Sequence, residues 1–120
     1  MMTFYEKYKE NIILIKSFRF AVNIVEYAEI LEEKRKFVIA NQILKGGTSV
    51  GANIKEAQNA ESKADFIHKM KIAFKDAEET ESWLYLCNEL KNYPNPENLL
   101  SELSEIMKIL NKIIASSKKN

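Results

Sequence analysis

The chain has 120 residues, of which 46% are hydrophobic and 29% are charged, and its formal net charge is +1. This length suits one domain, and the composition is that of an ordinary globular protein. The small net charge gives no electrostatic argument for a nucleic-acid binder, because such proteins usually carry a strong basic excess.

Helical periodicity begins with a segment of about residues 9–32 that carries two apolar seams. The first seam consists of Leu14, Phe18, Ala21, Val25 and Ala28. The second seam consists of Phe20, Ile24, Tyr27 and Leu31. Because a bundle helix normally buries one stripe, we expect the second seam to remain exposed on a single chain and to form the interface of a homo-oligomer. The charged run of residues 32–36 is the expected turn.

The second segment, about residues 36–59, holds all three glycines of the chain, yet its helical period is unbroken. Each glycine costs a helix interior about 0.8–1 kcal/mol relative to alanine. We expect the backbone to stay helical through Gly46 and Gly47 because another backbone comes close there. That backbone belongs either to the same bundle or to another subunit.

Three polar residues of this segment follow one flank of its apolar stripe with the spacing i, i+4 and i+7. They are Ser49, Asn53 and Glu56. The favoured interpretation is a buried or half-buried hydrogen-bond network that fixes the helix register, with Thr80 or Glu81 as the partner of Asn53. Contact with a ligand or nucleic acid is one alternative, and plain solvent exposure is the other.

The third segment, about residues 63–92, begins at a capping-box pattern that starts with Ser62. The fourth segment, about residues 96–116, follows Asn95 as a candidate cap and has Pro96 at its first helical position. Short connections force neighbouring helices to be antiparallel. We therefore predict an all-α fold, an up-down-up-down antiparallel four-helix bundle in a single domain.

Patterns that would indicate catalysis or metal binding lack the required residue types. Gly46 and Gly51 have the spacing of a phosphate-binding loop, but residues 52–53 are Ala-Asn in place of Lys-Ser/Thr. A di-metal bundle needs two Glu-x-x-His pairs, whereas His68 is the sole histidine. We therefore expect no catalytic, metal or cofactor-binding residues, no cofactor and no enzyme activity.

The cysteine content and the length of the apolar runs predict the cellular compartment. Cys87 is the sole cysteine, which excludes an internal disulfide and suits a reducing compartment. The apolar run of residues 12–15 is too short for a secretory signal, and no stretch is long enough for a membrane span. We expect a cytoplasmic protein that does not associate with membranes.

Four basic residues are candidate nucleic-acid contacts. Lys34, Arg35 and Lys36 crowd the first turn, and Lys45 lies on the second segment. The usual role of such residues is a solvated surface with weak ion pairs. A symmetric ring, however, would repeat any local basic patch several times.

Three stretches of the sequence point to one bacterial family. They are residues 42–58, residues 66–73 (Phe-Ile-His-Lys-Met-Lys-Ile-Ala) and residues 79–84 (Glu-Thr-Glu-Ser-Trp-Leu). The chain resembles the bacterial four helix bundle protein family, whose members are encoded by intervening sequences within large-subunit ribosomal RNA genes. These proteins are related to the accessory variability protein of diversity-generating retroelements. The resemblance extends over about residues 18–113.

This resemblance implies a four-helix bundle that assembles as a ring, typically a pentamer. For the retroelement relative it also implies partnership with reverse transcriptase and RNA. We therefore expect a non-enzymatic homo-oligomeric scaffold or adaptor that associates with RNA or with an RNA-processing protein. The alternative is a small ligand-binding module that uses a polar groove or the lumen of the ring.

Overall fold

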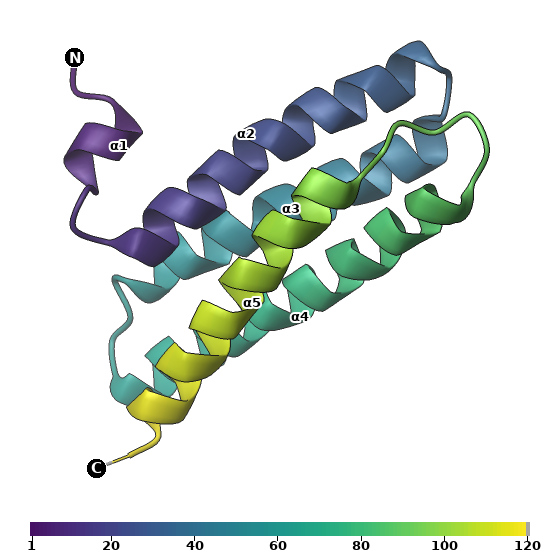
Figure 1. Cartoon of the computed structure of the whole chain (residues 1–120). Helices are drawn as coiled ribbons and strands as arrows, with labels where there is room; N and C mark the ends of the chain where they lie inside the picture. The colour runs from purple at the N-terminus through teal and green to yellow at the C-terminus, as the bar shows by residue number, and fades with distance from the viewer. Residues whose placement is uncertain (120) are drawn as a thin grey trace.

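The computed structural model describes residues 1–119, and all the regular structure in that range is helical. The elements are α1 (Phe4–Lys7), α2 (Ile12–Glu33), α3 (Phe37–Ala57), α4 (Lys63–Glu89) and α5 (Glu97–Ser117). Helices α2 to α5 form the predicted antiparallel four-helix bundle, and α1 lies beside the N-terminal part of α2 (Figure 1). Within residues 1–119, no helix combines the length and the apolar character needed to cross a membrane.

Each bundle helix packs against two neighbours. Contacts join α2 to α3, α3 to α4, α4 to α5, and α5 back to α2. The helices therefore follow one another around the bundle in chain order. As a consequence, the groove between α3 and α4 lies on the side opposite the groove between α2 and α5.

The first bundle helix, α2, begins and ends at identifiable caps, whereas α3 begins after Lys36 without a side-chain cap. Helix α2 begins at Ile12, later than predicted, because the Asn11 side chain accepts a hydrogen bond from the Leu14 N–H over 3.3 Å. At its other end Arg35 adopts a left-handed φ of 64°, and the Lys36 N–H donates to the Leu31 carbonyl over 2.8 Å. This is a Schellman ending built without glycine.

The last two helices also start near the predicted caps. The Ser62 hydroxyl accepts a hydrogen bond from the Asp65 N–H over 3.0 Å at the start of α4. The Asn95 side chain accepts from the Glu97 N–H over 2.8 Å at the start of α5. Helix α4 ends earlier than predicted, at Glu89, and Asn92 in the following turn adopts a φ of 65°.

The prediction that the second apolar seam of α2 is an exposed oligomer interface is wrong. Its four residues are the core of the single chain, with exposed fractions of 0%, 0%, 6% and 0% for Phe20, Ile24, Tyr27 and Leu31. Helix α2 contacts both α3 and α5, so its buried arc is wide enough to take in this seam. In the first seam, by contrast, Val25 is 38% exposed.

Candidate functional site

The glycines of α3 allow its neighbours to approach closely. The backbone is helical throughout residues 37–57, as predicted. A Cβ atom added to Gly47 would lie 2.7 Å from two side-chain carbons of Ile24 on α2, and one added to Gly46 would lie 2.6 Å from the Thr80 hydroxyl on α4. The close approach therefore comes from within the bundle, on both sides of α3.

The polar residues Ser49 and Asn53 face α4, where Asn53 has a partner other than the predicted ones. The Asn53 amide donates to a carboxylate oxygen of Asp76 over 2.7 Å and to the Ser49 carbonyl over 3.2 Å. Thr80 instead donates to the Asp76 carbonyl over 2.8 Å, so the predicted partners Thr80 and Glu81 are wrong. Glu56 is exposed, and the cross-helix contact is made by Asn53.

A polar groove lies over this contact, between α3 and α4, with a volume of about 360 Å³. It is lined by Lys45, Gly46, Ser49, Ile72, Lys75, Asp76 and Glu79. Burial raises the pKa of the Asp76 carboxyl, the Asn53 hydrogen bond opposes that rise, and the nearby charge of Glu79 adds to it. The groove therefore presents mixed charge on an open surface.

The predicted nucleic-acid residues are divided between two places. Lys34, Arg35 and Lys36 form the turn between α2 and α3, and the Lys36 ammonium lies 5.1 Å from the centre of the Tyr93 ring. Lys45 lies farther along α3, in the polar groove that also contains Asp76 and Glu79. Lys45 is thus separated from the turn and has carboxylates close by.

A second group of lysines gathers where α4 begins and α5 ends. This lysine cluster consists of Lys63, Lys71, Lys118 and Lys119. Lys63 donates to the Lys119 carbonyl over 2.7 Å, and repulsion by the Lys118 charge lowers the pKa of Lys71. The sequence shows both groups of lysines, but only the antiparallel packing of α4 on α5 reveals that they meet.

An apolar patch continues the polar groove toward one end of the bundle. Val38 lies seven residues before Lys45, and Leu86 lies seven residues after Glu79, so both share the flanks that line the groove. Leu90 follows Leu86 by four residues. We call Val38, Leu86 and Leu90 the α3–α4 patch; their exposed fractions are 75%, 43% and 38%.

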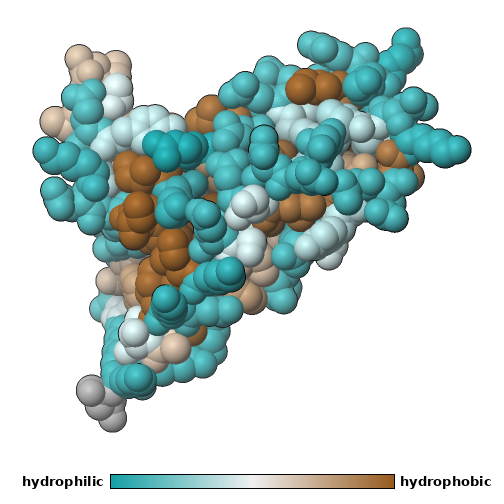
Figure 2. Space-filling model, in the orientation of Figure 1, coloured by the Kyte–Doolittle hydropathy of each residue, from teal (hydrophilic) through white to brown (hydrophobic). Residues whose placement is uncertain are grey.

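A second apolar patch lies in the opposite groove, near the other end of the bundle. Ile12 precedes Lys16 by four residues, and Lys16 forms an ion pair with Glu105 of α5 over 2.8 Å. Ile109 and Ile113 continue this face of α5, and both are half-buried, whereas Ile12 is 58% exposed. Figure 2 shows a hydrophobic band on this side of the molecule, between the start of α2 and the C-terminal half of α5. We call these three isoleucines the α2–α5 patch.

The two residues most often linked to chemistry are the sole histidine and the sole cysteine of the sequence. His68 is exposed on α4, and Cys87 is buried, which raises the pKa of its thiol. No group of three His, Cys, Asp or Glu side chains within residues 1–119 is arranged to hold a metal ion.

Comparison with known proteins gives a family and a fold. The model of the family described as 23S rRNA-intervening sequence protein matches residues 9–112. The crystal structure of a protein of unknown function from the S23 ribosomal protein family of Bacteroides thetaiotaomicron VPI-5482 superposes with a TM-score of 0.81. The two chains are 45% identical, and the match covers 85% of this chain and 97% of that one. No curated protein matches the chain.

Proposed function

The chain belongs to the 23S rRNA-intervening sequence protein family, and we propose that it acts in the cytoplasm as a non-enzymatic, homopentameric scaffold that holds RNA or an RNA-processing protein. The observation that carries this proposal is the pair of apolar patches in opposite grooves of the bundle. The number five rests on the family resemblance alone.

Two different patches favour a head-to-tail assembly. An isologous dimer buries the same patch on both subunits, whereas a ring joins one patch to a different patch of the next subunit. In the proposed interface, Leu86 and its neighbours in the α3–α4 patch pack on Ile12 and its neighbours in the α2–α5 patch of the next copy. Every subunit then uses both patches, and a closed ring leaves neither exposed.

The apolar area is sufficient to hold such an interface together. Complete burial of a Val, Leu or Ile side chain stabilises by about 1.5–3 kcal/mol. The six patch residues are already partly buried, so each contributes about half of that free energy on association. Together they contribute about 5–9 kcal/mol before the cost of association. Exposed apolar side chains of this kind also mark interaction surfaces in general.

The test is the molar mass in solution, measured by light scattering. Wild-type protein should have the mass of five chains of 13.9 kDa, and Leu86→Glu and Ile12→Glu should each reduce it to a single chain. Val22→Glu is the matched control, because Val22 is 40% exposed on α2 but lies outside both patches. Its mass should equal that of the wild type.

Mixing the two variants distinguishes a head-to-tail interface from an isologous one. Leu86→Glu keeps an intact α2–α5 patch, and Ile12→Glu keeps an intact α3–α4 patch. An equimolar mixture should therefore form a heterodimer, since one good interface is restored. A wild-type mass of one chain would refute self-association, and a mixture that stays monomeric would refute this pairing of patches.

The RNA part of the proposal is supported by the lysine cluster and by the family description. Mutual repulsion lowers the pKa of Lys71, and a phosphate placed near Lys71 and Lys118 would relieve it. A ring would repeat the cluster in every subunit, so a net charge of +1 per chain is compatible with a local phosphate-binding surface.

RNA retention measured over a series of salt concentrations tests this surface. We expect weak, salt-sensitive binding to generic RNA, and Lys71→Ala/Lys118→Ala should lower the affinity and flatten the salt dependence. Lys34→Ala/Lys36→Ala tests the alternative surface at the first turn. If the second pair of substitutions reduces binding and the first does not, the RNA surface lies at the turn.

A further inference from the structure

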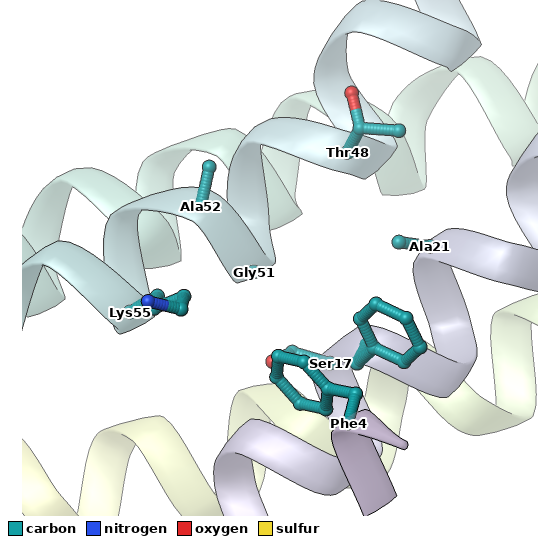
Figure 3. Close-up of a pocket in the computed structure, with 8 residues that line it drawn as sticks. Phe4, Ser17, Ala21, Thr48, Gly51, Ala52 and Lys55 are labelled. Atoms are coloured by element: carbon teal, nitrogen blue, oxygen red, sulfur yellow. The ribbon is translucent and has the colours of Figure 1, made fainter. Parts of the chain in front are cut away.

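A hollow of about 200 Å³ lies between α2 and α3, on a different side of α3 from the polar groove. Figure 3 shows Ala52, Gly51 and Thr48 on α3 across this space from Phe4, Ser17 and Ala21. The full lining comprises Phe4, Ser17, Phe18, Ala21, Thr48, Gly51, Ala52 and Lys55. Most of these side chains are small or aromatic, so the wall of the hollow is almost entirely apolar.

The hollow exists because small residues meet at this helix crossing. Gly51 faces Ser17, whose carbonyl oxygen would be in ordinary contact, at 3.4 Å, with a Cβ added to Gly51. Beside this contact, Ala21 and Ala52 leave the interhelical space unfilled. The hydroxyls of Ser17 and Thr48 already donate to the Leu14 and Leu44 carbonyls, over 3.2 Å and 2.7 Å. The hollow therefore has no unused hydroxyl proton that requires a polar guest.

Helix α1 closes the hollow with an aromatic ring. The Phe4 and Phe18 rings are stacked, with centroids 4.0 Å apart and planes inclined by 8°. The Tyr5 ring contacts the Phe18 ring edge-on, with centroids 5.5 Å apart. Helix α1 is therefore held over the hollow mainly by aromatic contacts. Helix α1 also lies outside residues 9–112, so the roof is contributed by a part of the chain beyond the family match.

One positively charged side chain, that of Lys55, lies at the edge of the hollow. Lys55 is the one charged residue that lines the hollow, and its ammonium lies 5.7 Å from the centre of the Tyr8 ring. Within residues 1–119, Lys55 forms no ion pair, whereas Lys16 and Lys69 do. The ammonium is thus positioned to meet an anionic group on a guest whose remainder is apolar.

We infer that this hollow binds a small aromatic carboxylate, with one ring under Phe4 and the carboxylate at Lys55. The size favours a single ring, because an apolar cavity of about 150 Å³ in another protein takes up benzene and drug-sized pockets are larger, at about 300–1,000 Å³. The charge favours an anion, and Phe4 and Phe18 give the wall two aromatic rings against which a guest ring can pack. The proposal is independent of the assembly and RNA proposals, since it uses neither apolar patch and no residue of the lysine cluster.

Phenylacetate is the probe for this site, and NMR titration of the full chain is the measurement. We expect saturable shifts at the amides of residues 51–55, with a dissociation constant on the order of 0.1–1 mM for so small a ligand. Phenylacetamide, which lacks the charge, and cyclohexylacetate, which lacks the aromatic ring, should each bind at least about fivefold more weakly.

Three variants assign the binding to the hollow. Lys55→Met removes the cation and should weaken phenylacetate binding at least about fivefold without changing phenylacetamide binding. Ala21→Leu fills the hollow and should abolish both. Lys45→Met is the matched control, because it removes a lysine from the other side of α3, and it should bind as the wild type does. Unsaturable shifts, or equal binding by wild type and Lys55→Met, would overturn the proposal.

Discussion

Replacement of single glycines in α3 by alanine should change stability in opposite directions at Gly47 and Gly51. Alanine improves helix propensity by about 0.8–1 kcal/mol at either position. At Gly51 the new Cβ would meet its nearest atom at 3.4 Å, an ordinary contact, so we expect the substitution to stabilise by about 0.5–1 kcal/mol. At Gly47 the same Cβ would lie 2.7 Å from two carbons of Ile24.

The overlap at Gly47 outweighs the gain in helix propensity. Ile24 has an exposed fraction of 0%, so its side chain can shift only against other side chains of the core. Overpacking of this kind costs about 1–3 kcal/mol, and the overlap with three Ile24 carbons places the cost in the upper part of that range. The net effect of Gly47→Ala is therefore a loss of about 1–2 kcal/mol. Gly47→Leu should cost several kcal/mol.

Urea and thermal unfolding followed by circular dichroism measure both variants, at several protein concentrations because assembly would raise the apparent stability. For a chain of this size, 1 kcal/mol corresponds to a shift of about 3–6 °C in Tm. Ile24→Ala provides the coupling test, since it removes all three clashing atoms and should make Gly47→Ala much less harmful. If Gly47→Ala stabilises the protein as much as Gly51→Ala, close packing does not explain this glycine.

Three further substitutions test the helix ends and the polar groove by urea unfolding. Arg35→Gly should stabilise by about 0.5–1 kcal/mol, because glycine adopts the left-handed φ at this helix end without strain; a loss of stability would contradict this. Ser62→Ala should destabilise by about 0.5–2 kcal/mol through loss of the cap of α4, and an unchanged midpoint would show that the cap is dispensable. Burial raises the pKa of Asp76, so the stability that its carboxyl contributes is present below its unfolded pKa and is lost as the pH rises through its folded pKa. Asp76→Asn should thus be at least as stable as wild type at neutral pH and lose this advantage toward about pH 3; a difference independent of pH would refute the shift.

Local patterns in the sequence were sufficient to predict the bundle. The 3.6-residue period is a property of each helix, so it identifies the four long helices without knowledge of their neighbours. Ser62 caps α4 as predicted. At the start of α5 the Asn95 side chain accepts from the Glu97 N–H, but the N-cap position is that of Pro96 and the helix begins at Glu97, one residue later than predicted. The glycines of α3 also allowed a prediction. Because glycine lowers the stability of a helix, three glycines within one helix indicate that a neighbouring backbone or side chain packs closely against it.

Properties that depend on pairs of helices could not be read in the same way. Asn53 was correctly placed on the flank that faces another helix, but its partner depends on the register of α3 against α4, which brings in Asp76. The seam of Phe20 and Ile24 is apolar whether it faces a second subunit or the chain's own core. The prediction that this seam lies at an oligomer interface was wrong because α2 packs against two helices. Sequence spacing does not give the width of the arc of α2 that these two helices bury.

The positions of the two apolar patches also restrict the kind of assembly that they can build. A head-to-tail interface closes into a ring only if each step rotates the next subunit by the right angle, about 72° for five copies, and otherwise gives an open filament. The grooves of the bundle lie on opposite sides, which alone would favour a straight chain of subunits. The patches, however, lie near opposite ends of the helices, so joining Leu86 of one copy to Ile12 of the next also shifts the next copy along the bundle axis. Closure then requires that the interface rotate the next copy as well. A ring gives one mass that is constant above the assembly concentration, whereas a filament gives a mass that grows with concentration. Light scattering over a range of concentrations therefore decides between the two.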